Sequence, residues 1–483
     1  MKNKKDKYVK LIEPSIKDAR MRRRTQIEFI DFLLDPKYLN LGAGKKYMLK
    51  TYGCQGNLAD SEKIAGILEM MGYEETNNEL EASFILFNTC AIRENAEERV
   101  FGELGRLQKY KKQNPDMLIG ICGCMPQEEK TVSKIKEKYK QIDIVFGTHN
   151  IASLPEYLYD RITSDKKVIE VLSIEGDIYE NVPVKRDHPK KAWVNIMYGC
   201  DEFCTYCIVP YTRGKERSRK PEAIIEEVQK LAEAGYQEVT LLGQNVNAYG
   251  NDFEDLKYTF ADLLVDLNKI PINRIRYTTS HPRDLDDATI DAMALGGNIM
   301  PHLHLPVQSG SNTILKKMNR KYTKENYMDK INKLKEKVPG ITITTDIIVA
   351  FPGETEEDFQ KTIDLVKEVG YAGAYTFIYS PREGTPAAKL PNPLTEEEKH
   401  ARLNALNEVV NEYSLKAHQR FEDEVVEVLV EGPSKNNPKM MTGYTKHNML
   451  VNFEGDNVLV GDIINVKITK AYSWHLFGEL IKE

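Results

Sequence analysis

The sequence predicts an α/β chain in three parts: an N-terminal doubly wound parallel sheet, a central partial (βα)6 barrel and a C-terminal small β-barrel. Two observations predict this. Short apolar runs alternate with charged, helix-forming stretches in residues 45–160 and 186–420, as in parallel sheets covered by helices. In residues 421–483 the pattern changes to short β-like runs separated by turns, which favours a small barrel. At about 150 residues per domain, a chain of 483 residues has room for three domains.

The composition narrows the class of protein. The chain is 41% hydrophobic and 29% charged, as globular proteins are, and its net charge of −6 restricts any nucleic-acid contact to local patches. It has no apolar run near the ~18 residues that span a bilayer, and no apolar signal region at its start. Seven cysteines at short spacings suit metal binding in a reducing cytosol better than disulfides. We therefore expect a cytoplasmic protein without a membrane partner.

Residues 1–44 form a basic N-terminal extension. Its first 24 residues contain ten Lys or Arg and three Asp or Glu. Runs of charge are usually solvated, and contact with RNA is the alternative. The apolar stretch at 27–34 predicts one amphipathic helix.

The N-terminal domain, residues 45–160, repeats strand, turn and helix. We predict its strands at 47–52, 84–88, 118–122 and 142–146, and its helices at 58–71, 92–112 and 127–139. Alternation of elements of this length is typical of a parallel sheet with helices on both faces.

Cysteines follow three successive strands of this domain. Cys54, Cys90 and Cys124 each come where a predicted strand ends. Ligands of such sheets bind beyond the carboxyl ends of the strands, so three thiols at that edge predict a metal-binding set. Packing in the core is the alternative, because free cysteine is often buried. Cys122 is a second candidate, but we assign Cys124 because it lies in the turn beyond the strand.

The central domain, residues 186–420, contains six predicted βα units. Their strands are expected at 194–197, 238–242, 274–279, 303–305, 341–348 and 375–379, with helices such as 221–234 and 355–369. Six units cannot close an eightfold barrel, and the site of such a fold lies at the carboxyl ends of its strands. Polar residues that follow the second to fourth strands are therefore candidates for binding a cofactor: Gln244, Asn245, Ser280 and Gln308. For His302 and His304, packing or substrate contact is favoured over metal binding.

Three cysteines follow the first strand of this domain, in the run Cys200-Asp201-Glu202-Phe203-Cys204-Thr205-Tyr206-Cys207. Iron–sulfur cubanes are usually held by four thiolates, so three closely spaced cysteines can hold three irons and leave the fourth open. An open iron can chelate the amino and carboxylate groups of S-adenosylmethionine (SAM). A zinc site or buried free thiols are the alternatives. Zinc usually takes C-x2-C pairs and needs a fourth ligand, and none is evident nearby in the sequence.

The C-terminal domain, residues 421–483, follows a predicted helix at 395–421. Strands are expected at 425–430, 449–453 and 463–468, in a small antiparallel barrel. Some of its aromatic and basic residues could stack on and pair with RNA, and core packing of the aromatic ones is the alternative: Lys446, His447, Tyr472, Trp474 and Phe477.

Together these motifs resemble the methylthiotransferase family of radical-SAM enzymes across residues 46–483. The surroundings of the first two cysteines, Thr51-Tyr52-Gly53-Cys54-Gln55 and Asn88-Thr89-Cys90-Ala91, resemble the branch that acts on N6-isopentenyladenosine in tRNA. Two positions depart from the family pattern: Gly56 stands where Met is usual, and Ala350 stands where Gly usually precedes Phe-Pro-Gly-Glu.

The resemblance implies an N-terminal domain with an auxiliary cluster, a radical-SAM partial barrel and a TRAM-like RNA-binding domain. It implies two 4Fe–4S clusters and SAM as cofactors. Cys200, Cys204 and Cys207 would hold the cluster that reduces SAM to a 5′-deoxyadenosyl radical. Cys54, Cys90 and Cys124 would hold the cluster that delivers sulfur, and a second SAM would supply the methyl group.

The implied product is a methylthio group at C2 of N6-isopentenyladenosine at position 37 of tRNA, next to the anticodon. The implied partners are that tRNA and an electron donor such as flavodoxin or ferredoxin, with the enzyme a monomer. Two other classes of function remain. One is a methylthiotransferase acting on another tRNA base or on a ribosomal protein side chain. The other is a non-enzymatic iron–sulfur regulator that binds RNA.

Overall fold

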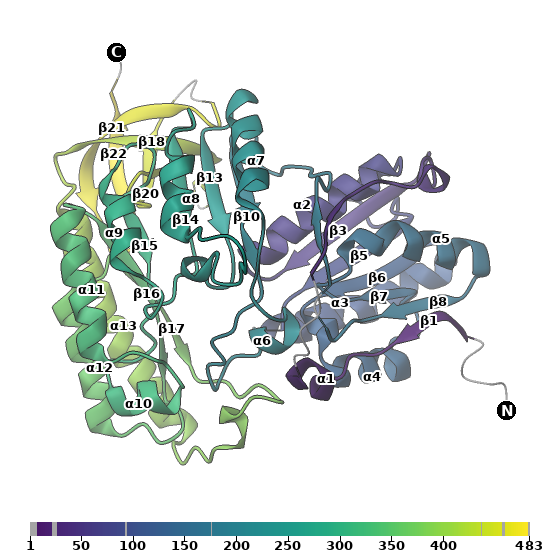
Figure 1. Ribbon diagram of the computed structural model, residues 1–483, viewed down its shortest axis with the longest axis horizontal. Coiled ribbons are helices and arrows are strands. Elements are labelled where there is room, and N and C mark those ends of the chain that lie inside the picture. The colour runs from purple at the N-terminus through teal and green to yellow at the C-terminus, as the bar shows by residue number, and fades with distance from the viewer. Residues whose placement is uncertain are drawn as a thin grey trace. The chain divides into compact units, whose positions relative to one another are not determined.

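Figure 1 shows a computed structural model of the chain, which describes residues 7–21, 27–91, 94–174, 176–435, 437–455 and 459–481. The chain divides into two compact units. The first contains residues 1–187, 198–201 and 208–219, and the second contains residues 188–197, 202–207 and 220–483.

The first unit is built on a seven-stranded sheet in the order β1-β8-β7-β6-β5-β3-β4. Every neighbouring pair of strands in it is parallel. The strands are β1 (Tyr8–Ile12), β3 (Lys46–Tyr52), β4 (Glu74–Glu75), β5 (Phe84–Thr89), β6 (Leu118–Gly123), β7 (Ile144–Phe146) and β8 (Lys167–Glu170). The predicted parallel sheet is confirmed.

Helices cover both faces of this sheet. Its central strands are buried throughout, which explains their continuous apolar runs. One apolar core contains residues of α2 and α5, and the other contains residues of α3 and α4. The helices of the unit are α1 (Ile16–Met21), α2 (Gln55–Met70), α3 (Glu94–Gln113), α4 (Glu129–Lys138), α5 (Leu154–Ser164) and the single turn α6 (Val209–Thr212). Two helical layers around a parallel sheet make the fold doubly wound.

The helix predicted at 27–34 is wrong. Its centre is a short strand, β2 (Phe29–Asp31), which pairs in parallel with β9 (Ile178–Glu180). A short apolar run fits helix and strand equally well, and here the pairing with a segment about 150 residues away decides. The basic extension also supplies β1, an edge strand of the large sheet. Part of the basic arm 1–24 lies outside the described residues.

The second unit contains the predicted partial barrel. Two three-stranded parallel sheets, β10-β13-β14 and β15-β16-β17, are joined by a parallel bridge between Ile275 and Ile299. The strands are β10 (Lys191–Asn195), β13 (Glu238–Leu242), β14 (Arg274–Tyr277), β15 (His302–His304), β16 (Thr342–Val349) and β17 (Gly373–Ile378). The helices are α7 (Pro221–Glu233), α8 (Phe260–Leu267), α9 (Asp287–Ala294), α10 (Asn312–Lys317), α11 (Lys324–Lys337), α12 (Glu356–Val369) and α13 (Glu396–Gln419). The short strands β11 (Met197–Tyr198) and β12 (Arg217–Ser218) flank the cysteine run; β12 belongs to the first unit, and β11 spans the division between the two.

The chain ends in a closed five-stranded barrel, yellow in Figure 1. Its strands are β18 (Val425–Pro433), β19 (Met441–Thr445), β20 (Leu450–Glu454), β21 (Ile463–Ala471) and β22 (Leu476–Leu480), in the order β18-β19-β20-β22-β21. The barrel is not wholly antiparallel, because β20 and β22 pair in parallel. Strands β19 and β22 were not predicted; each contains a glycine, a residue that weakens the strand signal.

This barrel docks on the partial barrel through part-buried polar contacts. The Arg274 guanidinium, fully buried, donates to the Tyr444 carbonyl at 2.7 Å, and Thr342 Oγ1 donates to the His447 carbonyl at 2.7 Å. Lys446 Nζ pairs with a Glu427 carboxylate oxygen at 3.5 Å. The His447 contact is made by its backbone carbonyl and the Lys446 pair is part-exposed, so contact of these two side chains with RNA stays a prediction.

Across the described residues, no helix is both long enough and apolar enough to cross a membrane.

Candidate functional site

Three cysteines of the first unit lie at the carboxyl ends of three adjacent strands. Cys54 follows β3 and occupies the N-cap of α2, Cys90 follows β5, and Cys124 follows β6. The Cys124 amide donates to the Thr89 carbonyl at 2.8 Å, which ties the ends of β5 and β6 together. Gly123 permits this close approach: its φ is +94°, and a Cβ there would lie 2.3 Å from the Thr89 oxygen.

The three thiols are near one another. The Cys90 thiol donates a hydrogen bond to the Cys54 sulfur, and this bond is the largest cause that lowers the pKa of Cys54 to about 5. Burial opposes it, and the charge of Arg213 adds to it. Burial raises the pKa of the Cys124 thiol, against the nearby charge of Arg213 and with that of Cys54. Cys54 is thus linked to Cys90 by a hydrogen bond and to Cys124 through the charge of Arg213, so the three thiols form a compact donor set at the sheet edge.

Arg213 is the charged centre of this set. Its guanidinium is buried and pairs with the buried Asp60 carboxylate at 2.9 Å, while also hydrogen-bonding the Cys124 sulfur. A Cβ at Gly56 would lie 3.6 Å from both the Cys54 sulfur and Arg213 Nη2. The position that departs from the family pattern therefore borders the thiols directly.

A network of buried amides fixes the start of α2. Asn57 Nδ2 donates to Asn88 Oδ1 at 3.1 Å, and Asn88 Nδ2 donates to Ser61 Oγ at 2.9 Å. The Cys54 amide donates to Asn57 Oδ1 at 3.2 Å. These bonds hold the loop of Cys54 against the end of β5, so the polar residues around the first two cysteines are explained by positioning.

Cys122 lies elsewhere. It is the partner of Asn88 in the β5–β6 ladder, is fully buried, and packs in the apolar core beneath α2 and α5. Burial raises the pKa of its thiol well above the ordinary value. Its surroundings are those of a packing residue.

The second cysteine run is divided between the two units. In the first unit, the Cys200 amide donates to the Gly214 carbonyl at 3.1 Å. In the second, Cys204 is buried, and its sulfur accepts from Arg320 Nη1 at 3.2 Å. Arg320 also donates to the Pro306 carbonyl at 2.9 Å, which fixes its guanidinium. The Cys207 amide donates to the Cys204 carbonyl at 3.0 Å.

The candidate SAM residues follow strands of the partial barrel at one end. Gln244 and Asn245 follow β13, Ser280 follows β14, and Gln308 follows β15. Asn245, Ser280 and Gln308 are buried. Among the described residues, Asn245 Oδ1, Ser280 Oγ and Gln308 Oε1 are buried atoms without a hydrogen-bond partner. Buried polar atoms are normally paired, so these three fit a polar ligand such as SAM.

Backbone strain gathers at the same strand ends. Thr279, Gln308 and Ala350 all have positive φ, at +70°, +69° and +57°, which non-glycine residues rarely adopt. Such outliers cluster at ligand sites. Ala350, the second departure from the family pattern, thus holds a left-handed conformation that glycine would adopt more easily.

The charged residues of both sites were not predicted from the sequence. Beside Cys204 in the chain, Glu202 is buried and pairs with Arg283, and it lies with His281 and Asp284 in one cluster. Arg283 also pairs with Asp284 at 2.7 Å, so this cluster already contains its cation. His302 and His304 contact Thr344, in keeping with packing.

Family models match three parts of the chain: the Radical SAM superfamily at residues 194–366, the uncharacterized protein family UPF0004 at 46–147, and the TRAM domain at 419–481. Distantly, the chain resembles the solved cobalamin-dependent SAM radical enzyme OxsB, at 11% identity over 76% of this chain and 56% of that one, with a TM-score of 0.49.

Curated relatives match nearly the whole chain. A protein of Bacillus cytotoxicus is 56% identical over 97% of this chain and 92% of its own length. Proteins of Anoxybacillus flavithermus and Bacillus subtilis are each 55% identical over 98% of this chain and over 90% and 93% of their own lengths. All three are named tRNA-2-methylthio-N(6)-dimethylallyladenosine synthase. This radical-SAM chain therefore belongs to the family of the tRNA-2-methylthio-N(6)-dimethylallyladenosine synthases.

Proposed function

We propose that the chain is a radical-SAM methylthiotransferase that adds a methylthio group to C2 of N6-isopentenyladenosine at position 37 of tRNA. The observation that carries this proposal is the similarity over nearly the full length to relatives that bear the synthase's name. It fits a chain with two separate sets of three cysteines, and neither alternative function has a comparable observation in its favour.

Cys54, Cys90 and Cys124 would hold one 4Fe–4S cluster, and Cys200, Cys204 and Cys207 would hold the other. The donor set of the first unit fits such a group, because its three thiols lie at one edge of the sheet and the Arg213 guanidinium lies beside two of them, Cys54 and Cys124. Cys124 rather than Cys122 is assigned to that set, because Cys122 packs in the apolar core beneath α2 and α5. When bound, the clusters supply the one-electron and sulfur chemistry that replacing an aromatic C–H bond by a C–S bond requires.

The protein's own residues would position and neutralise these groups. Arg213 and Arg320 place positive charge and N–H donors beside the sulfurs of Cys124 and Cys204. Thiolate ligands are anionic, so such donors stabilise them and restrict their orientation. At the partial barrel, Asn245, Ser280 and Gln308 would bind polar groups of SAM through their unpaired atoms. Gln244, which precedes Asn245, would line the same end of the partial barrel.

The proposed partners follow from this chemistry. The substrate is tRNA that carries isopentenyladenosine, and reductive cleavage of SAM needs an electron donor such as flavodoxin or ferredoxin. We propose a monomer working in the cytoplasm, where tRNA and such donors are found.

Mass spectrometry of nucleosides tests the function. The reconstituted protein, incubated with SAM, a reductant and isopentenylated tRNA, should yield the methylthio nucleoside. The same tRNA transcript without the isopentenyl group is the matched control and should yield little product. Equal product from both RNAs would contradict the proposed substrate, and the absence of a methylthio nucleoside from both would contradict the proposed function.

A further inference from the structure

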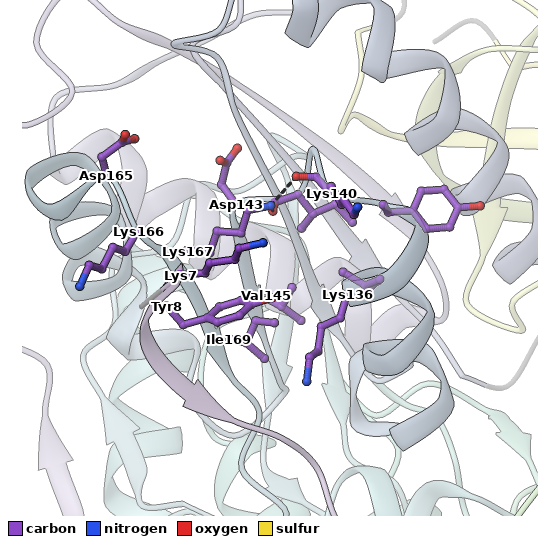
Figure 2. Close-up of a pocket in the computed structure, with 13 residues that line it drawn as sticks. Lys7, Tyr8, Lys136, Lys140, Asp143, Val145, Asp165, Lys166, Lys167 and Ile169 are labelled. Atoms are coloured by element: carbon purple, nitrogen blue, oxygen red, sulfur yellow. Dashed lines mark hydrogen bonds between the residues drawn. The ribbon is translucent and has the colours of Figure 1, made fainter. Parts of the chain in front are cut away.

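A pocket of about 450 Å³ lies in the first unit, away from the cysteines (Figure 2). Its walls come from β7 and the amino ends of β1 and β8, from the last turn of α4 and from the residues that follow α4 and α5. In an all-parallel sheet, the amino ends lie at the edge opposite the carboxyl ends, which carry Cys54, Cys90 and Cys124. The pocket is therefore distinct from the site described above.

Two kinds of side chain line it. Apolar and aromatic groups form one part: Tyr8, Ile135, Tyr139, Ile142, Val145 and Ile169. Five lysines form the other: Lys7, Lys136, Lys140, Lys166 and Lys167. Figure 2 shows the lysines around Tyr8, Val145 and Ile169. An apolar surface ringed by ammonium groups suits a molecule with a flat ring and a negative charge.

The acidic residues of the lining do little to offset this charge. The charge of Asp143 acts on Lys167, whose pKa burial lowers and this charge raises, but Asp143 forms its ion pairs with Lys111 at 2.9 Å and with Arg161 at 3.1 Å, two cations that do not line the pocket. Asp165 pairs with Arg161 at 2.7 Å and projects into solvent. Of the five lysines, Lys136 pairs with Glu13 at 2.8 Å. The pocket keeps an excess of positive charge.

Lys167 offsets partial negative charge that would otherwise repel an anion in the pocket. Helices α4 and α5 both end at the pocket, and the carbonyls at a helix end carry partial negative charge. The Lys167 ammonium donates to the carbonyls of Lys140 and Ile142, the latter at 2.8 Å, and so covers carbonyls that follow the α4 end. Burial lowers the pKa of Lys167, so an anion beside it would stabilise its charged form.

We propose that this pocket binds a phosphorylated nucleoside, with the lysines on the phosphate and the apolar part against the base. Lysine is a point-charge phosphate binder, and aromatic rings stack on bases whatever their sequence. Such a phosphorylated nucleoside can be a nucleotide within the tRNA chain or a free nucleotide. Binding of a tRNA nucleotide rests on the proposed function, whereas binding of a free nucleotide does not.

The test compares two variants of equal charge change in the full-length, reconstituted protein. Lys140→Glu/Lys166→Glu alters two exposed lysines of the pocket, and Lys109→Glu/Lys112→Glu alters two exposed lysines of α3 as the control. Adenosine monophosphate is the free probe, measured by calorimetry. An unmodified tRNA transcript is the RNA probe, measured by filter binding over a series of KCl concentrations.

We expect the pocket variant to bind one probe about tenfold more weakly than the control variant does. If the tRNA is that probe, its affinity should also depend less steeply on salt, by roughly 0.7–0.9 in the slope for each phosphate that is no longer neutralised. Weaker binding of adenosine monophosphate alone would assign the pocket to a free nucleotide. Equal binding of both probes by the two variants would overturn the proposal. Reductive SAM cleavage should be unchanged in both variants; should the wild-type protein make no methylthio product, the proposed function fails while the pocket result stands by itself.

Discussion

Arg213 is the buried cation beside Cys54 and Cys124. Its guanidinium and the Asp60 carboxylate are both buried and lie 2.9 Å apart. Arg213→Met leaves that carboxylate buried without its cation, so we expect a loss of roughly 3–5 kcal/mol in the free energy of unfolding. Urea denaturation of the cluster-free protein measures it.

The double variant Asp60→Asn/Arg213→Met is the control, because it removes both charges. It should recover most of the stability that the single variant loses. Equal losses in the single and double variants would mean that the ion pair has no such role.

Cys122 and Cys124 are two positions apart in the sequence, and we expect only Cys124 to hold a cluster. Cys124→Ala removes a proposed cluster ligand, so the reconstituted protein should fall from about eight irons per chain toward about four. Cys122→Ala removes a packed core thiol, so it should keep its iron and lose about 1 kcal/mol of stability. Iron analysis and thermal unfolding measure these two effects. Loss of iron in Cys122→Ala but not in Cys124→Ala would make Cys122 the ligand.

Spacing and strand-end placement in the sequence single out six cysteines as ligands, which stays a prediction, but nothing in the sequence points to their charged partners. Arg320 lies 116 residues from Cys204, whose sulfur it contacts, and Arg213 lies 153 residues from Asp60. No local pattern marks such pairs, because only the tertiary fold brings them together.

One buried carboxyl group, that of Glu354, holds the turn between β16 and α12 in place. Glu354 Oε2 accepts from the Ala350 amide at 2.7 Å and from Arg402 Nη1, on α13, at 2.8 Å. Burial raises the pKa of Glu354 from 4.5 to about 7, against those two donors and with Asp358 nearby. The native state therefore binds a proton more tightly than the unfolded chain does.

This raised pKa predicts a pH dependence with a definite sign. Its contribution is full below about pH 4.5 and is lost as pH rises to about 7, by up to about 3 kcal/mol. Glu354→Gln cannot titrate, so its stability should fall less than that of the wild-type protein between pH 5 and pH 8. Chemical denaturation at the two pH values checks this, and parallel falls would contradict it.

Helices and buried parallel strands were predicted closely, and elements whose apolar pattern is short or interrupted were not. The strand predicted at 238–242 matches β13, and the helix predicted at 355–369 matches α12 within one residue. The centre of the stretch at 27–34 is a strand because it forms a parallel pair with β9. Strands β19 and β22 were not predicted because the glycines that let neighbouring strands pack closely also weaken the apolar alternation.

Within the second unit, the C-terminal barrel is both a partner of the partial barrel and a proposed RNA surface. Deleting the barrel would leave the buried Arg274 and Thr342 without hydrogen-bond partners. A truncated protein would therefore lose stability, and a loss of tRNA affinity could not be assigned to a missing RNA contact. Two exposed aromatic residues, Tyr472 and Trp474, allow a cleaner test.

We expect Trp474→Ala and Tyr472→Ala each to weaken tRNA binding by about 1–3 kcal/mol if each ring stacks on a base. Leu459→Ala is the matched control, since Leu459 is also apolar and exposed on the same barrel. SAM cleavage without tRNA should be unchanged in all three. Equal tRNA affinity across the aromatic variants and the control would make this barrel a purely structural domain.

The central claim is that one molecule keeps radical generation and sulfur delivery on separate cysteine sets. The triple variant Cys54→Ala/Cys90→Ala/Cys124→Ala tests it most directly, with Cys200→Ala/Cys204→Ala/Cys207→Ala as its counterpart. Chromatography of 5′-deoxyadenosine and of tRNA nucleosides is the measurement. The first variant should release 5′-deoxyadenosine and form no methylthio nucleoside, and the second should form neither. Normal methylthio product from the first variant, or 5′-deoxyadenosine from the second, would contradict the account.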